Sequence, residues 1–117
     1  MAGPTGPCSA IDSYAPSGTA DFHAALSGGR VYGGRAPSLG GVPVWHDLSV
    51  IDGYPTDAPC GVSIAAQGND AYIKVLTVTG RIYQLHITVN GQNFTPDVVQ
   101  GWIELTPRPT PAVLRER

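Results

Sequence analysis

Three histidines and two cysteines are the side chains of this chain best suited to act as metal ligands, bases or nucleophiles. His23, His46 and His86 stand 23 and 40 residues apart and form no His-x-His or HExxH pattern, so their spacing does not favour a zinc site. A nucleophile on Cys8 or Cys60 would need a histidine and an orienting group beside it, and nothing in the spacing favours that. We therefore expect no metal, no cofactor and no catalytic residue.

The acidic residues point to turns rather than to acid–base chemistry. Five aspartates are scattered over predicted turns, and no two of them share a strand face in a way that suggests a general acid and base. They are Asp12, Asp52, Asp57, Asp70 and Asp97. The sequence therefore predicts a protein that is not an enzyme.

Aromatic side chains and arginines are the best candidates for a ligand-binding site. Sugar rings present apolar C–H faces that stack on aromatic rings, while arginine, asparagine or aspartate bind the hydroxyl groups. The candidates are Tyr32, Tyr83, Trp45, Trp102, Arg30 and Arg81. The alternative is that the tryptophans and tyrosines form the core, where each large ring buries about 150–250 Å².

Several of these candidates recur along the chain in the same order. Pro7-Cys8 returns as Pro59-Cys60 after 52 residues, Gly29–Tyr32 returns as Gly80–Tyr83 after 51, and Trp45–Leu48 returns as Trp102–Leu105 after 57. A period near 50 residues is typical of a multi-strand repeat unit. Two such units cannot close a ring of repeats alone, so the pattern predicts assembly with other copies. The predicted parts are residues 1–51, residues 52–106 and a Pro-rich docking tail, 107–117.

The two cysteines occupy equivalent places in this repeat. Two cysteines do not make a disulfide framework, and their simplest interpretation is a pair of small buried thiols. A bridge between Cys8 and Cys60 is geometrically feasible in a ring of repeats, but the sequence does not imply it.

The composition favours many short strands and excludes two classes of partner. The 117 residues include 15 glycines and 11 prolines, 42% are hydrophobic, and the formal net charge is −2. Such dense punctuation is typical of all-β folds. Without a basic cluster or a long apolar run, we expect no nucleic-acid and no membrane partner. Because the N-terminus lacks a signal-peptide pattern, we expect a soluble protein made in the cytoplasm, with a place on a virion or particle surface.

Alternation and turn signals predict a series of short strands. In Arg81–Val89 the side chains of Leu85, Ile87 and Val89 fall on one face with Tyr83. Asn90-Gly91 follows as a hairpin turn. The glycine-rich residues 34–43 are predicted to be a loop. Strands are expected at Ser9–Tyr14, Asp21–Leu26, Arg30–Gly33, Val44–Val50, Gly61–Ala66, Ala71–Val78, Arg81–Val89, Gln92–Thr95 and Gly101–Thr106.

The second unit resembles a blade of the lectin-like bacterial β-propellers. An apolar first strand, a second strand, Gly80-Arg81-Ile82-Tyr83 and a closing Trp102-Ile103-Glu104-Leu105 carry the resemblance, and the first unit matches at Gly29–Tyr32 and Trp45–Leu48. The resemblance implies two tandem antiparallel blades in a chain that builds a ring from several copies. A single β-sandwich is the alternative fold.

Two functions of different classes follow from these patterns. The first is a non-enzymatic structural or assembly protein of a large particle, such as a phage-like head decoration or tail component, with glycan binding as an additional role. The second is a homo-oligomeric carbohydrate-binding lectin of the two-blade propeller type. In both, the expected partners are other copies of the chain or further subunits of the assembly, and glycans.

Overall fold

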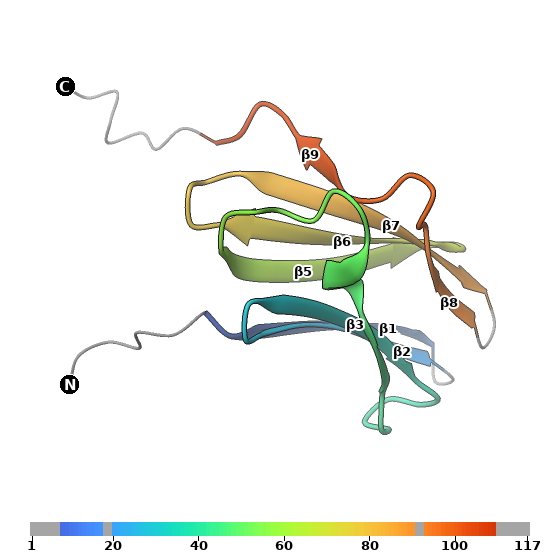
Figure 1. Cartoon of the computed structure of the whole chain (residues 1–117). Coiled ribbons are helices and arrows are strands. Elements are labelled where there is room, and N and C mark those ends of the chain that lie inside the picture. The colour runs from blue at the N-terminus through green and yellow to red at the C-terminus, as the bar shows by residue number, and fades with distance from the viewer. Residues whose placement is uncertain (1–7, 18–19, 91–92, 110–117) are drawn as a thin grey trace, which may run out of the picture.

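The computed structural model describes residues 8–17, 20–90 and 93–109. These residues form nine β-strands and one short 3-10 turn, with no α-helix among them. The strands make two antiparallel sheets that lie one against the other (Figure 1). The all-β prediction is therefore confirmed, and two packed sheets are compatible with both tandem units and a single sandwich.

Each sheet is built from strands that follow one another in the chain. Sheet A has the order β1 (Ala10–Ser17), β2 (Ala20–Ser27), β3 (Arg30–Ala36) and β4 (Val44–Asp47). Sheet B contains β5 (Pro59–Gln67), β6 (Asp70–Thr77), β7 (Ile82–Asn90), β8 (Asn93–Pro96) and β9 (Ile103–Leu105). Both β8 and β9 pair with β7, β8 near its end and β9 near its start.

Two glycines form the turn between β2 and β3 of sheet A. Gly28 and Gly29 have φ values of +62° and +80° and connect β2 to β3, whose flanking residues Ser27 and Arg30 pair directly. A two-residue hairpin of this kind needs positive φ at both positions, which glycine adopts without the steric cost of a Cβ.

The hydrophobic core lies between the two sheets. Along β6 every second residue is buried, and in β7 the predicted apolar face of Leu85, Ile87 and Val89 is confirmed as core. Sheet A contributes the opposite wall, where a Cβ on Gly33 would come within 2.8 Å of Leu48 Cδ1 and 2.9 Å of Phe94 Cζ. Side chains of sheet B therefore pack directly on the backbone of β3, as expected for a close-packed interior.

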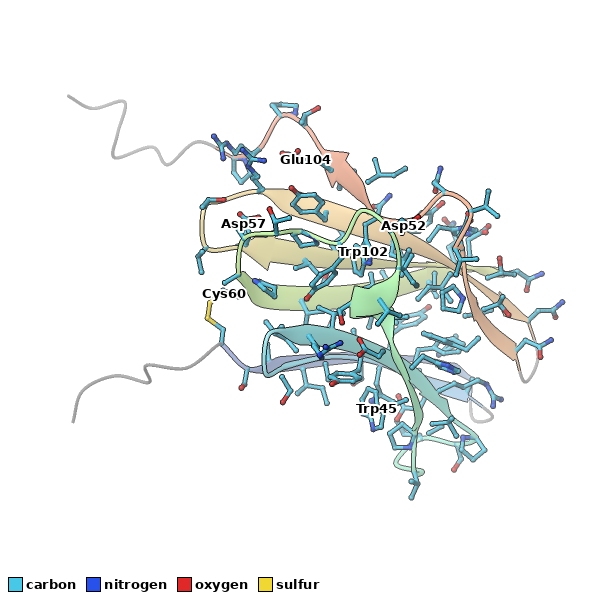
Figure 2. All side chains as sticks on the ribbon, viewed as in Figure 1. Trp45, Asp52, Asp57, Cys60, Trp102 and Glu104 are labelled. Atoms are coloured by element: carbon cyan, nitrogen blue, oxygen red, sulfur yellow. A yellow bond between two sulfur atoms is a disulfide. The ribbon has the colours of Figure 1, made fainter. Side chains whose placement is uncertain are left out.

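A disulfide joins the two halves of the chain, and the prediction of two free buried thiols is wrong. Cys8 bonds to Cys60 with a Cα–Cα distance of 4.9 Å and a sequence separation of 52 residues (Figure 2). Nearby, the backbone N–H of Ile64 in β5 donates to Asp12 Oδ2 in β1 at 3.0 Å. The two sheets are therefore linked covalently and by a hydrogen bond along β1 and β5.

Three predicted strand ends differ from the structure by three residues each, and the other strand boundaries differ by no more than two. β1 runs on to Ser17, and β3 continues through the predicted loop to Ala36, where pairing with β2 holds it. The strand predicted at Val44–Val50 ends at Asp47, because the Asp47 side chain accepts from Ser49 N at 3.0 Å and caps a 3-10 turn, η1 (Leu48–Val50).

Two other predictions lie partly outside the described residues. β7 and β8 pair as a hairpin, but Asn90 is the last residue of β7 and pairs with Asn93, so the prediction that Asn90 is a turn residue is wrong. Residues 91–92 are outside the described ranges. The docking tail is described only to Pro109, and there Arg108 Nη1 donates to Thr79 O at 3.2 Å. The boundary expected after residue 51 falls in the connector between η1 and β5. The division into parts stays a prediction.

Corresponding strands of the two sheets pair in the same register. Tyr32 of β3 lies opposite Asp47 of β4, and Tyr83 of β7 lies opposite Glu104 of β9. These are the pairs that the predicted repeat frame matches. The interval from tyrosine to tryptophan grows from 13 to 19 residues because sheet B inserts β8 between β7 and β9. The register agrees with the repeat, whose propeller-blade nature stays a prediction.

Candidate functional site

Two of the six predicted site residues, Tyr32 and Trp45, come together on sheet A. With Ala25 and Ser27 they line a shallow hollow of about 290 Å³ on the side of the sheet that faces away from sheet B. β2, β3 and β4 position these four residues, because Ala25 pairs with Tyr32 and Ser27 lies two residues further along β2. We call this side the outer face of sheet A; it also carries Ile11 of β1.

Trp45 lies on the edge strand β4 and is exposed on this face. It pairs with Gly34, and a Cβ at Gly34 would stand only 3.2 Å from Trp45 Cε3, so the absent side chain lets the indole lie across the strand. The His23 ring is 5.8 Å away, measured between ring centroids. Trp45 is 42% exposed, so its assignment to the core is wrong for the single chain. The physical reason is that no element formed by the described residues covers this side of sheet A.

Trp102, which matches Trp45 in the predicted repeat, directly precedes β9 of sheet B and is buried. It is 5% exposed and donates its Nε1–H to Leu48 O at 3.0 Å, so the core assignment is confirmed for this tryptophan (Figure 2). The ring of Tyr54 meets it edge-on at 5.6 Å. Burial is the main cause that raises the pKa of Tyr54 to about 12, so its hydroxyl stays protonated and donates to Gly29 O at 3.0 Å.

Arg30 and Arg81 each stand beside an acidic residue. Arg30 Nη1 contacts Asp47 Oδ2 at 2.8 Å and also donates to Ser49 Oγ at 3.1 Å. Burial raises the pKa of Asp47, but hydrogen bonds from Ser49 and Arg30 outweigh it and leave that pKa lowered. In sheet B a hydrogen bond with Tyr83 and the charge of Glu104 raise the pKa of Arg81. Both arginines are thus held beside strand ends.

The six predicted residues therefore fall into three places. Tyr32, Trp45 and Arg30 belong to sheet A and its outer side, Arg81 and Tyr83 belong to β7 and the turn before it, and Trp102 is sealed between the sheets. No single pocket in the described part of the chain collects them all.

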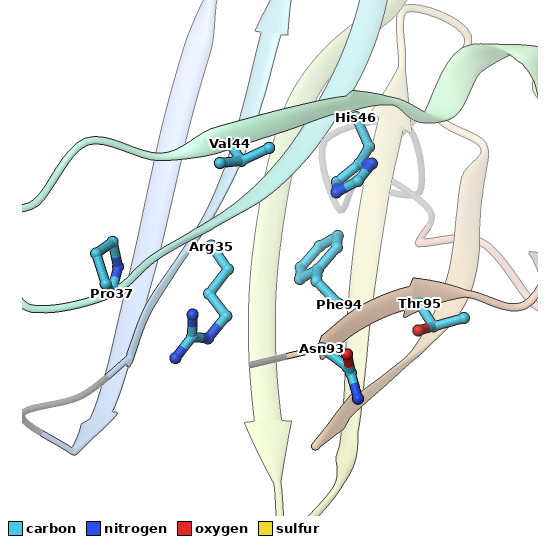
Figure 3. Close-up of a pocket in the computed structure, with 7 residues that line it drawn as sticks. All are labelled: Arg35, Pro37, Val44, His46, Asn93, Phe94 and Thr95. Atoms are coloured by element: carbon cyan, nitrogen blue, oxygen red, sulfur yellow. The ribbon is translucent and has the colours of Figure 1, made fainter. Parts of the chain in front are cut away.

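A second pocket, missed by the sequence reasoning, opens between the two sheets (Figure 3). It measures about 470 Å³ and mixes cationic, amide and aromatic side chains. Its lining residues are Arg35, Pro37, Val44, His46, Asn93, Phe94 and Thr95. The rings of His46 and Phe94 stack with centroids 5.6 Å apart and planes 7° from parallel. The sequence signal for this pocket was that Val31, Gly33 and Arg35 fall on one side of an extended strand. The assignment of residues 34–43 to a loop hid that signal.

A polar cluster on sheet B also escaped the sequence reasoning. His86 Nε2 lies 2.7 Å from Asp70 Oδ1, and its Nδ1 lies 3.5 Å from Asp97 Oδ2, with the ring of Tyr72 5.1 Å away. The backbone N–H of Gln100 and the side chain of His86 lower the pKa of Asp97 against a smaller effect of burial. Two predicted turn aspartates thus bracket one strand histidine on the surface.

Two further features are absent from the described residues. No group of three or more His, Cys, Asp or Glu side chains there is arranged to hold a metal ion. Among the same residues there is also no helix with the length and apolar character needed to cross a membrane. Comparison with protein-family models, with curated proteins and with solved structures finds no match.

Proposed function

We propose that this protein is a non-enzymatic structural protein that assembles with other copies of itself, as a component of a large particle such as a phage-like head decoration or tail component. The supporting observation is that apolar side chains stay uncovered on both outer sides of the two-sheet body. On sheet A these are Ile11, 68% exposed, and Trp45. On sheet B the side away from sheet A leaves Leu76 43% and Ile103 40% exposed. Apolar surface left exposed is a feature of protein–protein contact sites when it forms a contiguous patch.

The state of the cysteines supports a non-enzymatic role. Cys8 and Cys60 are bonded to each other, so neither offers the thiolate that nucleophilic catalysis needs. The disulfide instead fixes the start of β1 to β5, which favours a rigid building block.

Sedimentation velocity and light scattering at micromolar concentration test this proposal on the whole chain. We expect a defined species larger than the monomer. The proposed function is contradicted by a well-folded, monodisperse monomer over the whole concentration range.

The alternative function is a homo-oligomeric carbohydrate-binding lectin, and the hollow formed by Tyr32 and Trp45 favours it. A sugar ring stacked on the exposed indole would have its apolar face on Trp45 and Ala25. Glycan-array binding by the wild-type chain, lost in Trp45→Ala and kept in Val99→Ala, would support it. Val99 is 95% exposed and does not line the hollow, so it controls for loss of a surface side chain. Equal binding by both variants would reject this site.

A further inference from the structure

Corresponding residues of the two sheets have different environments, because those of sheet A face the core and those of sheet B face away from it. In sheet A, Leu26 pairs with Val31, and both are buried against sheet B. In sheet B the matching pair is Leu76 with Ile82, but in β6 the residues turned towards sheet A are Ala71, Ile73, Val75 and Thr77. Leu76 and Ile82 therefore face away from sheet A.

As a result, a row of apolar side chains on sheet B is not packed against sheet A. Leu76 pairs with Ile82 across β6 and β7, and Ile82 pairs with Leu105 across β7 and β9. The row has its counterpart in Leu26, Val31 and Leu48 of sheet A, which are between 0% and 1% exposed. The same apolar row is thus fully buried in one sheet, whereas in the other Leu76 is exposed and Ile82 and Leu105 are only partly buried. We call the side with Leu76, Ile82, Ile103 and Leu105 the outer face of sheet B.

The opposite sides of the sheets show the complementary difference. Trp102 is covered by sheet A and bonds to Leu48 O, whereas Trp45 lies uncovered on the outer face of sheet A. Leu48 corresponds to Leu105 in the repeat frame, so the carbonyl that accepts from the Trp102 indole has its counterpart in the carbonyl of Leu105 in β9. Each outer face therefore repeats one half of the interface inside the chain.

We propose that the outer face of sheet A in one copy docks on the outer face of sheet B in the next copy, in the arrangement in which sheets A and B already pack within the chain. This inference rests on the proposed self-assembly and names its surfaces. The row Leu76–Ile82–Leu105 then fills the hollow of Ala25, Tyr32 and Trp45. The Trp45 indole donates to the Leu105 carbonyl of the neighbouring copy.

Such a contact is heterologous, because two different faces meet. Its repetition leads to a closed ring when the rotation between copies closes, and to a filament when it does not. Contacts between like faces, A on A or B on B, would instead stop at a symmetric dimer.

A complementation experiment separates these arrangements. Trp45→Glu and Leu76→Glu each place a charge on one outer face, and both positions are exposed enough to leave the monomer folded. We expect each variant alone to be monomeric and an equimolar mixture to form a one-to-one dimer, because the mixture retains one intact A–B contact. Val99→Asp is the control, since Val99 lies on neither outer face, and it should assemble like the wild type.

The outcomes distinguish this inference from the proposed function. Assembly of Trp45→Glu alone would show a B–B contact, and assembly of Leu76→Glu alone would show an A–A contact. Either result would overturn the proposed docking of face A on face B and leave the proposed self-assembly intact. A monomeric wild type overturns both. If circular dichroism shows that either variant is unfolded, Ile11→Glu and Ile103→Glu replace it on faces A and B.

Photo-crosslinking detects the same contact when the dimer formed through a single interface is too weak to isolate. With p-benzoylphenylalanine in place of Trp45, we expect intermolecular crosslinks to peptides that contain Leu76 or Leu105. Crosslinks confined to strands β1–β4 of the neighbouring copy would overturn the proposal.

Discussion

Trp45 and Trp102 hold matching places in two sheets and have opposite environments. Trp102 is sealed between the sheets with its indole N–H satisfied, while Trp45 lies across Gly34 on an uncovered face. This difference shows that the element packed against a strand decides which side of the strand is buried. From the residue type alone, both tryptophans would be expected to be buried.

Truncation of the two tryptophans should give the largest contrast. We expect Trp102→Ala to lower the free energy of unfolding by about 3–5 kcal/mol, because it opens a cavity between the sheets. Under dilute, monomeric conditions Trp45→Ala should cost less than about 1 kcal/mol, since half-exposed surface side chains contribute little. Urea unfolding followed by circular dichroism measures both. Equal losses would remove the comparison.

Loss of the disulfide should loosen the packing of sheet A on sheet B, and we expect the fluorescence of Trp102 to detect this while that of Trp45 does not. Cys8→Ser with Cys60→Ser removes a cross-link over 52 residues, and we expect a cost of about 2–4 kcal/mol. In a Trp45→Phe background the remaining fluorescence comes from Trp102. Its emission should shift to the red as sheet packing loosens, whereas Trp45 in a Trp102→Phe background should change little. A shift of Trp45 alone would contradict the arrangement.

Adjacent glycines test the two sides of β3. A Cβ at Gly34 would meet Val44 O at 2.5 Å, while one at Gly33 would meet the ends of the Leu48 and Phe94 side chains. Side chains can move more readily than a paired backbone, so we expect Gly34→Ala to cost more than Gly33→Ala, each within about 1–3 kcal/mol. Thermal unfolding compares them. A larger loss for Gly33→Ala would mean that the inner side is the more rigid one.

Asp47 should give the smallest effect, through pH. Its folded-state pKa is lowered by Ser49 and Arg30, so its contribution is present above the unfolded pKa and is lost as the pH falls through the folded value. As the pair is largely exposed, we expect less than about 1 kcal/mol. Urea midpoints of wild type and Asp47→Asn should converge as the pH is lowered below about 4. A constant difference at all pH values would show that the charge is not the cause.

Sequence patterns predicted much of the fold because strand alternation and turn chemistry are local. The face of Leu85, Ile87 and Val89 and the antiparallel pairing of β7 with β8 follow from residues close together in the chain, although the turn was predicted one residue too early. The repeat anchors also matched the observed register of Tyr32 with Asp47 and of Tyr83 with Glu104.

The features that escaped depend on long-range packing. The strand Val44–Asp47 has no alternating pattern, so nothing indicated that Trp45 would face outward. Arg35 followed two glycines and was assigned to a loop, which hid its place in the pocket between the sheets. His86 meets Asp70 and Asp97 only after the strand register is known.

Association of copies is expected to cover Trp45. In a Trp102→Phe variant shown to be folded, acrylamide quenching of Trp45 is measured over the concentration range in which sedimentation follows assembly. The account predicts strong quenching of the dilute monomer and marked protection as the assembly forms. Assembly without protection of Trp45 would contradict it.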